Sequence, residues 1–229
     1  MEHLINKAGR QRMLTERMVK SYVQIVSHVT PQAAAGALAD AIGAFERQLG
    51  ELKASATEGD TRSAIAESER TWGRFRTIVA LPCTRERVHE VRTAGERLVQ
   101  SAERATAAFV RHAKSTAARL VNLAGRQRML CQRIAKDHLL IAERFGNGGV
   151  RQELTFACVD FGRALADLRA SPANTVVLRG ELTEVASSWR TLLELVRADS
   201  AAQDHVLACA EDVLQRMEHV TALYQSLGK

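Results

Sequence analysis

Aromatic residues are scarce in this sequence, at 4% of the chain, and only three prolines occur. Alternating apolar and polar runs typical of β-strands are absent, which argues against a sheet. No stretch approaches the roughly 18 consecutive apolar residues that a transmembrane helix needs. The start of the chain also lacks the basic and apolar regions of a signal peptide. We therefore expect no membrane segment and a cytoplasmic location as written, or a periplasmic one if a signal or anchor was removed before Met1.

The chain also lacks the common signatures of metal sites and enzymes. Its four cysteines form no CxxC pair and no zinc spacing, so we interpret them as small, partly buried apolar residues; they are Cys83, Cys131, Cys158 and Cys209. His205 and Cys209, four residues apart, would supply only half of a metal site. No GxSxG, HExxH, phosphate loop or pair of catalytic carboxylates occurs. The sequence predicts a protein that is not an enzyme and uses no metal or cofactor.

Good helix formers dominate instead, with a formal charge of +6 that favours anionic partners. Breaks in the helical pattern fall at 30–31, 58–60, 81–82, 146–149, 171–172 and 198–200. They predict helices over 4–28, 33–56, 61–79, 84–145, 151–170, 175–197 and 201–227.

The heptapeptide AGRQRML occurs twice, at 8–14 and at 124–130. Trp72 and Trp189 recur at nearly the same offset, and both are expected to pack in a core. Residues 95–109 likewise match 210–224. The fold class expected is all-α, with two tandem up-down four-helix bundles over 1–115 and 116–229. Because no proline separates the units, we expect the bundles to stack end to end, joined by a shared helix over 84–145.

In each AGRQRML copy one arginine lies on the apolar side of the predicted helix. Arg12 and Arg128 lie in the middle of apolar stripes, where an unpaired guanidinium is costly to bury. Such an arginine can reach solvent, pair with a carboxylate or hold an external anion. Glu16 could pair with Arg12, but the equivalent residue in the second unit is the neutral Gln132. The opposite side of each helix is expected to be polar, with Arg10, Arg17, Lys20 and Gln24 in the first copy and Arg126, Arg133 and Lys136 in the second.

Both copies resemble the start of the sensor domain shared by PilJ-type pilus chemoreceptors and NarX-type nitrate sensors, with the pattern N-x-A-G-x-x-R-M-x-x-x-R. Asn6, Ala8, Gly9, Arg12, Met13 and Arg17 meet this pattern, and so do Asn122, Ala124, Gly125, Arg128, Met129 and Arg133. The resemblance implies a four-helix bundle whose arginine, here Arg12 or Arg128, holds nitrate between the first helices of two protomers. It also implies a lysine two positions before the glycine. Lys7 supplies this lysine in the first copy, whereas Leu123 takes its place in the second.

The sequence thus predicts a non-enzymatic sensor that binds a small oxyanion such as nitrate or nitrite and signals through a protein partner. The ligand-binding residues expected are Lys7, Gly9, Arg12, Met13, Arg17, Gly125, Arg128, Met129 and Arg133. A continuous shared helix would hold Arg12 and Arg128 about 24 Å apart, so a two-arginine site would need a homodimer. A helical interaction scaffold without a small ligand is the alternative. Nucleic-acid binding is a weaker one, because aromatic residues for stacking are few.

Overall fold

The computed structural model describes residues 1–146, 148–198 and 202–227. Over these ranges the chain contains no strand, and apart from one 3₁₀ turn, η1 (Arg85–Arg87), every element is an α-helix. The helices are α1 (Glu2–Val26), α2 (Pro31–Ser55), α3 (Gly59–Val79), α4 (Val88–Ala113), α5 (Thr116–Ala142), α6 (Gly148–Ala170), α7 (Val176–Arg197) and α8 (Gln203–Ser226). The predicted all-α class is therefore confirmed.

Six of the seven predicted helices agree with the structure to within a few residues. Their ends follow ordinary helix signals: Pro31 begins α2 at a position where its missing N–H costs nothing, and the hydroxyl of Thr175 accepts from the backbone N–H of Leu178 at the start of α7. Residue 201, the predicted start of the last helix, lies outside the described residues. So do residues 147, 199 and 200 of the predicted breaks.

The predicted shared helix over 84–145 is wrong. The segment after Pro82 forms η1 before α4 begins, and α4 ends at Ala113. Lys114 then adopts a left-handed conformation with φ of 47°, and the chain reverses. Ser115 caps the next helix, because its hydroxyl accepts from the N–H of Ala118 at 3.0 Å. A serine before a helical run was the signal for this break, although no proline or glycine marks it.

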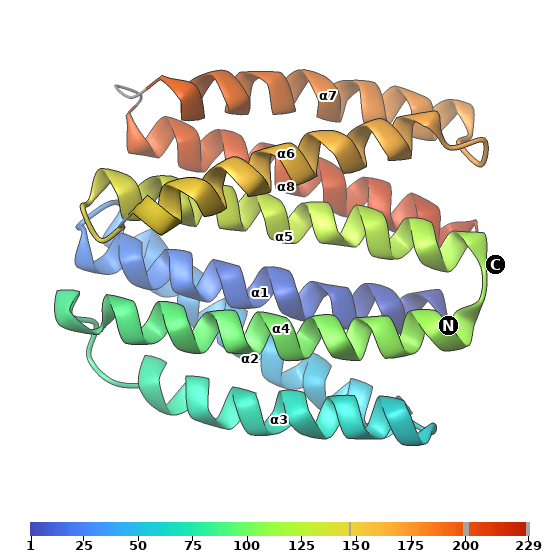
Figure 1. Ribbon diagram of the computed structural model, residues 1–229, viewed down its shortest axis with the longest axis horizontal. Helices are drawn as coiled ribbons and strands as arrows, with labels where there is room; N and C mark the ends of the chain where they lie inside the picture. Colours follow the sequence, from blue (N-terminus) through green and yellow to red (C-terminus); the bar gives the residue numbers. More distant parts are fainter. Residues whose placement is uncertain (147, 199–201, 228–229) are drawn as a thin grey trace.

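As a result the two bundles lie side by side rather than end to end (Figure 1). Helices α1 to α4 form the first bundle and α5 to α8 the second, and the most extensive packing between them joins α1 to α5. These two helices run in the same direction. Near their N-terminal ends Ser115 donates to Glu2 at 2.8 Å, and in their C-terminal halves Lys136 donates to Glu16 at 2.8 Å. The repeated AGRQRML segments therefore face each other in one chain.

The repeat extends to the core of each bundle. Trp72 stacks on Phe45 with ring centroids 4.4 Å apart, and Trp189 stacks on Phe161 at 4.2 Å. All four side chains are buried, which confirms the core position predicted for both tryptophans. The two stacks join α2 to α3 and α6 to α7. The central pair is covered by α2 and α4 on α1 and by α6 and α8 on α5.

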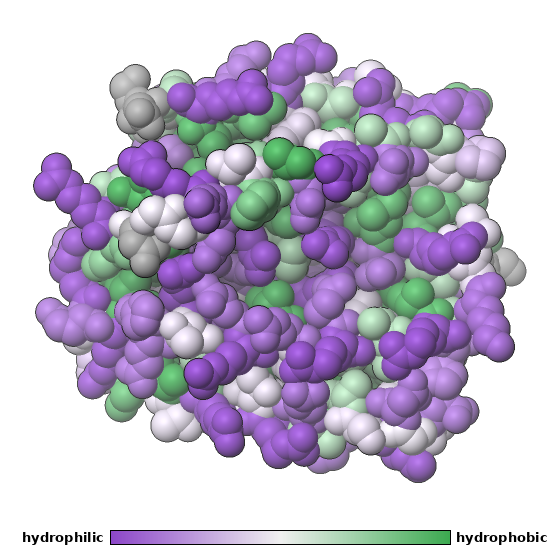
Figure 2. Space-filling view, viewed as in Figure 1, coloured by the Kyte–Doolittle hydropathy of each residue, from purple (hydrophilic) through white to green (hydrophobic). Residues whose placement is uncertain are grey.

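The face in Figure 2 is mostly hydrophilic, with apolar residues scattered among charged ones. No helix within the described ranges is both long and apolar enough to cross a membrane.

Candidate functional site: an arginine pair between α1 and α5

Arg12 and Arg128 lie at the contact between α1 and α5, and both are buried, with 0% and 2% of their surfaces exposed. Glycines make room for them. A side-chain carbon at Gly9 would lie 2.9 Å from Nη2 of Arg12, and one at Gly125 would lie 3.2 Å from Nη2 of Arg128. The spacing G-x-x-R therefore has a physical reason, because the guanidinium folds back over the helix turn where the glycine lies.

The two guanidinium groups are also close to each other. The position that a side-chain carbon at Gly125 would take lies 3.8 Å from Nη2 of Arg12 and 3.2 Å from Nη2 of Arg128. These two nitrogens are therefore at most about 7 Å apart, a separation at which like charges repel. This proximity corrects the predicted separation of the two arginines. The homodimer was predicted because the arginines could not meet within one chain, and the structure removes that reason.

Each of the three guanidinium nitrogens of Arg12 has a hydrogen-bond partner. Its Nη1 donates to Glu103 Oε2 at 2.5 Å, its Nη2 to Asn122 Oδ1 at 3.1 Å and its Nε to the Gly9 carbonyl at 3.3 Å. Burial lowers the pKa of Arg12, and the charge of Glu103 opposes this change. Glu103 comes from α4, so the candidate partner from the same helix, Glu16, is the wrong one.

Arg128 lacks such a counterion. Its Nη2 donates to Asn6, at 2.7 Å to Oδ1 and 3.3 Å to the carbonyl. Its buried Nε has no hydrogen-bond partner among the described residues, and no described carboxylate forms an ion pair with it. Burial lowers the pKa of Arg128 to about 9; the charge of Glu218 opposes this change, and the positive charges of Arg10 and Arg12 reinforce it. Arg128 is therefore a buried guanidinium without a direct ion pair among the described residues.

The asparagines of the repeated pattern explain why each arginine crosses to the other bundle. Asn122 accepts from Arg12, and Asn6 accepts from Arg128, so the two units exchange equivalent hydrogen bonds. The predicted set of ligand-binding residues does not include these two asparagines, although the repeated pattern contains them. Their carbonyl oxygens occupy the edge of each guanidinium that a planar anion would also use.

A second layer of charge lies further along the central pair. Glu16 is buried and accepts from Arg133 Nε and Lys136 Nζ, both at 2.8 Å. Burial alone would raise the pKa of Glu16, but these two cations outweigh it and lower that pKa to about 2. On the other side Arg17 pairs with Glu211 of α8, where Gln132 also donates at 3.1 Å.

The remaining predicted residues divide into those near the arginine pair and those away from it. Met13 and Met129 are buried in the core on either side of the pair. Lys7 points away and forms an ion pair with Glu51 of α2, so the structure does not bring it to the arginines. The side predicted to be polar is also partly wrong, because Lys20, Gln24 and Lys136 are buried. Lys20 lies beside Glu211 of α8, and Lys136 pairs with Glu16 of α1.

Sequence comparison agrees with this duplicated arrangement. The family described as "Type IV pili methyl-accepting chemotaxis transducer N-term", PilJ, matches residues 1–115 and again residues 109–215. The chain belongs to the PilJ family. No curated protein and no solved structure matches it. Membership places this PilJ-type chain among the sensor and signalling modules of chemotaxis transducers, which act with signalling partners and are not an enzyme family.

The chain holds two copies of the PilJ module, and the first helices of the two copies, α1 and α5, pack together. One polypeptide therefore supplies both arginines of the pair, one from each copy. The two copies are not identical, since Glu16 corresponds to Gln132 and Lys7 corresponds to Leu123. A single chain can give its two arginines different surroundings, and Arg12 and Arg128 differ in this way.

Proposed function

We propose that this PilJ-type protein is a sensor whose ligand is a small oxyanion, with nitrate and nitrite as the first candidates, held between Arg12 and Arg128. One observation carries the proposal: Arg128 is buried beside a second arginine, and within the described residues no carboxylate forms an ion pair with it. Burying an uncompensated charge is costly, so a structure that keeps one gains stability from an anion that neutralises it. The planar fork of each guanidinium suits a planar oxyanion.

Binding would change the central helix contact. To receive the anion, Nη2 of each arginine must exchange an asparagine oxygen for a ligand oxygen, which frees Asn6 and Asn122. The anion would also relieve repulsion between the two guanidiniums. Because α1 and α5 contact most other helices, a shift in their packing changes both bundles. A partner that prefers one of the two packings would then sense the ligand.

The test is calorimetry and thermal unfolding of the full chain with nitrate, nitrite, sulfate and chloride. Wild type should gain about 2.7 kcal/mol at a ligand concentration one hundred times the dissociation constant. Arg128→Met should lose this gain. Without ligand the same variant should be as stable as wild type or more so, because replacing an uncompensated buried charge with an apolar residue removes a desolvation cost. A variant that had merely lost its fold would show the opposite.

Arg76→Met is the control. Arg76 is 56% exposed and pairs with Glu46 on the surface of the first bundle, and its charge is not among those that shift the pKa of Arg12 or Arg128. It should keep the anion response of wild type. If no anion stabilises wild type beyond a general salt effect, the sensing proposal fails. The interaction-scaffold function then takes its place, which the internal ion pair of Arg12 with Glu103 favours.

A further inference from the structure

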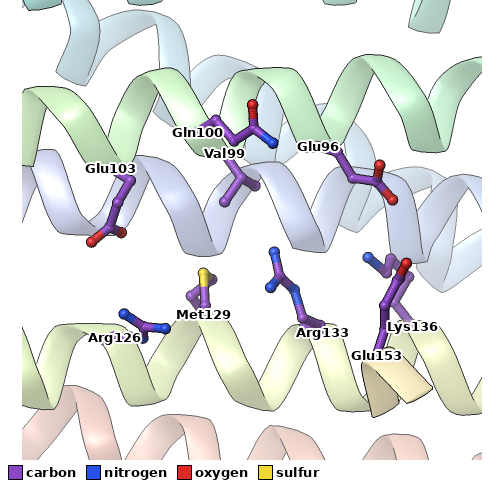
Figure 3. Close-up of a pocket in the computed structure, with 9 residues that line it drawn as sticks. All are labelled: Glu96, Val99, Gln100, Glu103, Arg126, Met129, Arg133, Lys136 and Glu153. Atoms are coloured by element: carbon purple, nitrogen blue, oxygen red, sulfur yellow. The ribbon is translucent and has the colours of Figure 1, made fainter. Parts of the chain in front are cut away.

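A pocket of about 300 Å³ lies between α4 and α5 (Figure 3), and Arg128 is not among the residues that line it. Its two walls carry opposite charges. Glu96 and Glu103 come from α4, whereas Arg126, Arg133 and Lys136 come from α5, and Glu153 of α6 lies at one end. The carboxylate of Glu103 points from α4 toward α5, and the guanidinium of Arg133 points back toward α4. Val99 and Met129 add apolar surface between the charges.

The internal repeat shows what this groove would be if it were closed. The equivalent groove lies between α8 and α1 in the other half of the molecule. There Arg10 pairs with Glu218 at 3.1 Å and Arg17 pairs with Glu211 across the two helices. By the repeat, the matching pairs across the pocket would be Arg126 with Glu103 and Arg133 with Glu96.

Neither matching pair forms on the basic wall, because both arginines have other partners. Arg126 pairs with Asp160 of α6 at 3.3 Å, and Arg133 pairs with Glu16 of α1 at 2.7 Å. The repeat-equivalents of these two acids are Ala44 and Gln132, which carry no charge. The second unit therefore has acids that draw its arginines away from α4.

The acidic side chains of α4 also have partners other than Arg126 and Arg133. Glu103 pairs with Arg12, and Glu96 pairs with Arg92, one turn earlier on α4, at 3.1 Å. The repeat-equivalent of Arg92 is Leu207. Both walls thus keep their charges, but sequence differences specific to this groove hold them apart and leave a pocket.

We propose that the α4/α5 pocket binds a small zwitterion of the amino-acid type, with its carboxylate on Arg126 and Arg133 and its ammonium on Glu96 and Glu103. Three acidic and three basic side chains line the pocket, so their formal charges cancel and a singly charged ion gains little from the summed field. A ligand with one charge of each sign matches both walls. A volume of about 300 Å³ is at the low end for ligand pockets, which suits one small metabolite.

The experiment is calorimetry of the full chain with each of the standard L-amino acids, together with propionate and ethylamine as singly charged probes. At least one amino acid should bind, and more tightly than either singly charged probe. Arg126→Gln should weaken that binding about tenfold or more, the effect expected when one charge-assisted hydrogen bond is lost. The side chain of Arg126 is 45% exposed and its only described ion pair is at the surface, so this variant should remain folded.

Arg10→Gln is the matched control, because Arg10 is the repeat-equivalent of Arg126 in the closed groove. It should bind the amino acid as wild type does. The proposal is overturned if no amino acid binds, if propionate binds as tightly as the amino acid, or if both variants lose affinity equally. The two sites share Glu103, which pairs with Arg12. Arg126 forms no described hydrogen bond with Arg12 or Arg128, so a nitrate titration of Arg126→Gln tests the oxyanion proposal separately.

Discussion

Replacing Glu16 by glutamine tests the charge network at the centre of the molecule. Glu16 is 2% exposed, and its carboxylate binds both Arg133 and Lys136. Glutamine is the residue that the second repeat carries at this position, as Gln132, so the helix and its packing accept the shape. The substitution changes the charge and little else.

The structure sets the size of the effect. Removing one partner of a buried ion pair typically costs about 3–5 kcal/mol, because the other charge stays buried without compensation. The fall in the pKa of Glu16 from 4.5 to about 2 corresponds to about 3 kcal/mol of stability in its ionised form. Lys136 is the charge left behind, with only Asp137 near it at 3.3 Å, whereas Arg133 is 30% exposed and can reach solvent. We therefore expect Glu16→Gln to lose about 3 kcal/mol at neutral pH.

The loss should depend on pH in one direction. Because the folded-state pKa of Glu16 is lower than its unfolded value, its contribution is fully present above about pH 4.5 and disappears as the pH falls toward 2. Urea unfolding followed by circular dichroism at pH 6 and at pH 3 measures both values. The difference between wild type and Glu16→Gln should be large at pH 6 and smaller at pH 3.

Glu46→Gln is the control. Glu46 pairs with Arg76 on the surface, where both side chains are at least 40% exposed, and an exposed pair of this kind contributes about 0–1 kcal/mol. If Glu16→Gln costs no more than this control, or if its cost is the same at pH 6 and pH 3, the reasoning about the buried network is wrong.

Two further predictions concern buried or closely packed positions. Burial raises the pKa of Asp137 from 3.8 to about 6, so ionisation of this carboxyl destabilises the fold as the pH rises through that range. Asp137→Asn should therefore be as stable as wild type near pH 4 and more stable at pH 7, by up to about 3 kcal/mol. Equal unfolding midpoints of the two proteins at pH 7 would contradict this. A side-chain carbon at Gly95 would lie 2.5 Å from Val19 Cγ2, whereas Gly50 has open space. In thermal unfolding, Gly95→Ala should therefore lose about 1–3 kcal/mol and Gly50→Ala should gain about 0.5–1 kcal/mol; the same sign for both would refute the packing argument.

The sequence alone was sufficient for the local features of this protein. Helix-forming composition and evenly spaced breaks predicted six helices with nearly correct bounds, because helix ends depend on the residues beside them. The repeat identified Trp72 and Trp189 as equivalent core residues. The helical period placed Arg12 and Arg128 in apolar stripes, since the neighbours of a helical residue on its own face follow from the 3.6-residue period.

Only the tertiary structure decided how the two units meet. The reversal at Lys114 rests on one residue in a left-handed conformation, and its cost of about 1–2 kcal/mol is small beside the burial gained when α1 packs along α5. Local sequence patterns do not contain that gain, because it comes from residues more than a hundred positions apart. The same long-range packing chose Glu103 rather than Glu16 for Arg12, left Arg128 without a carboxylate and opened one of two equivalent grooves.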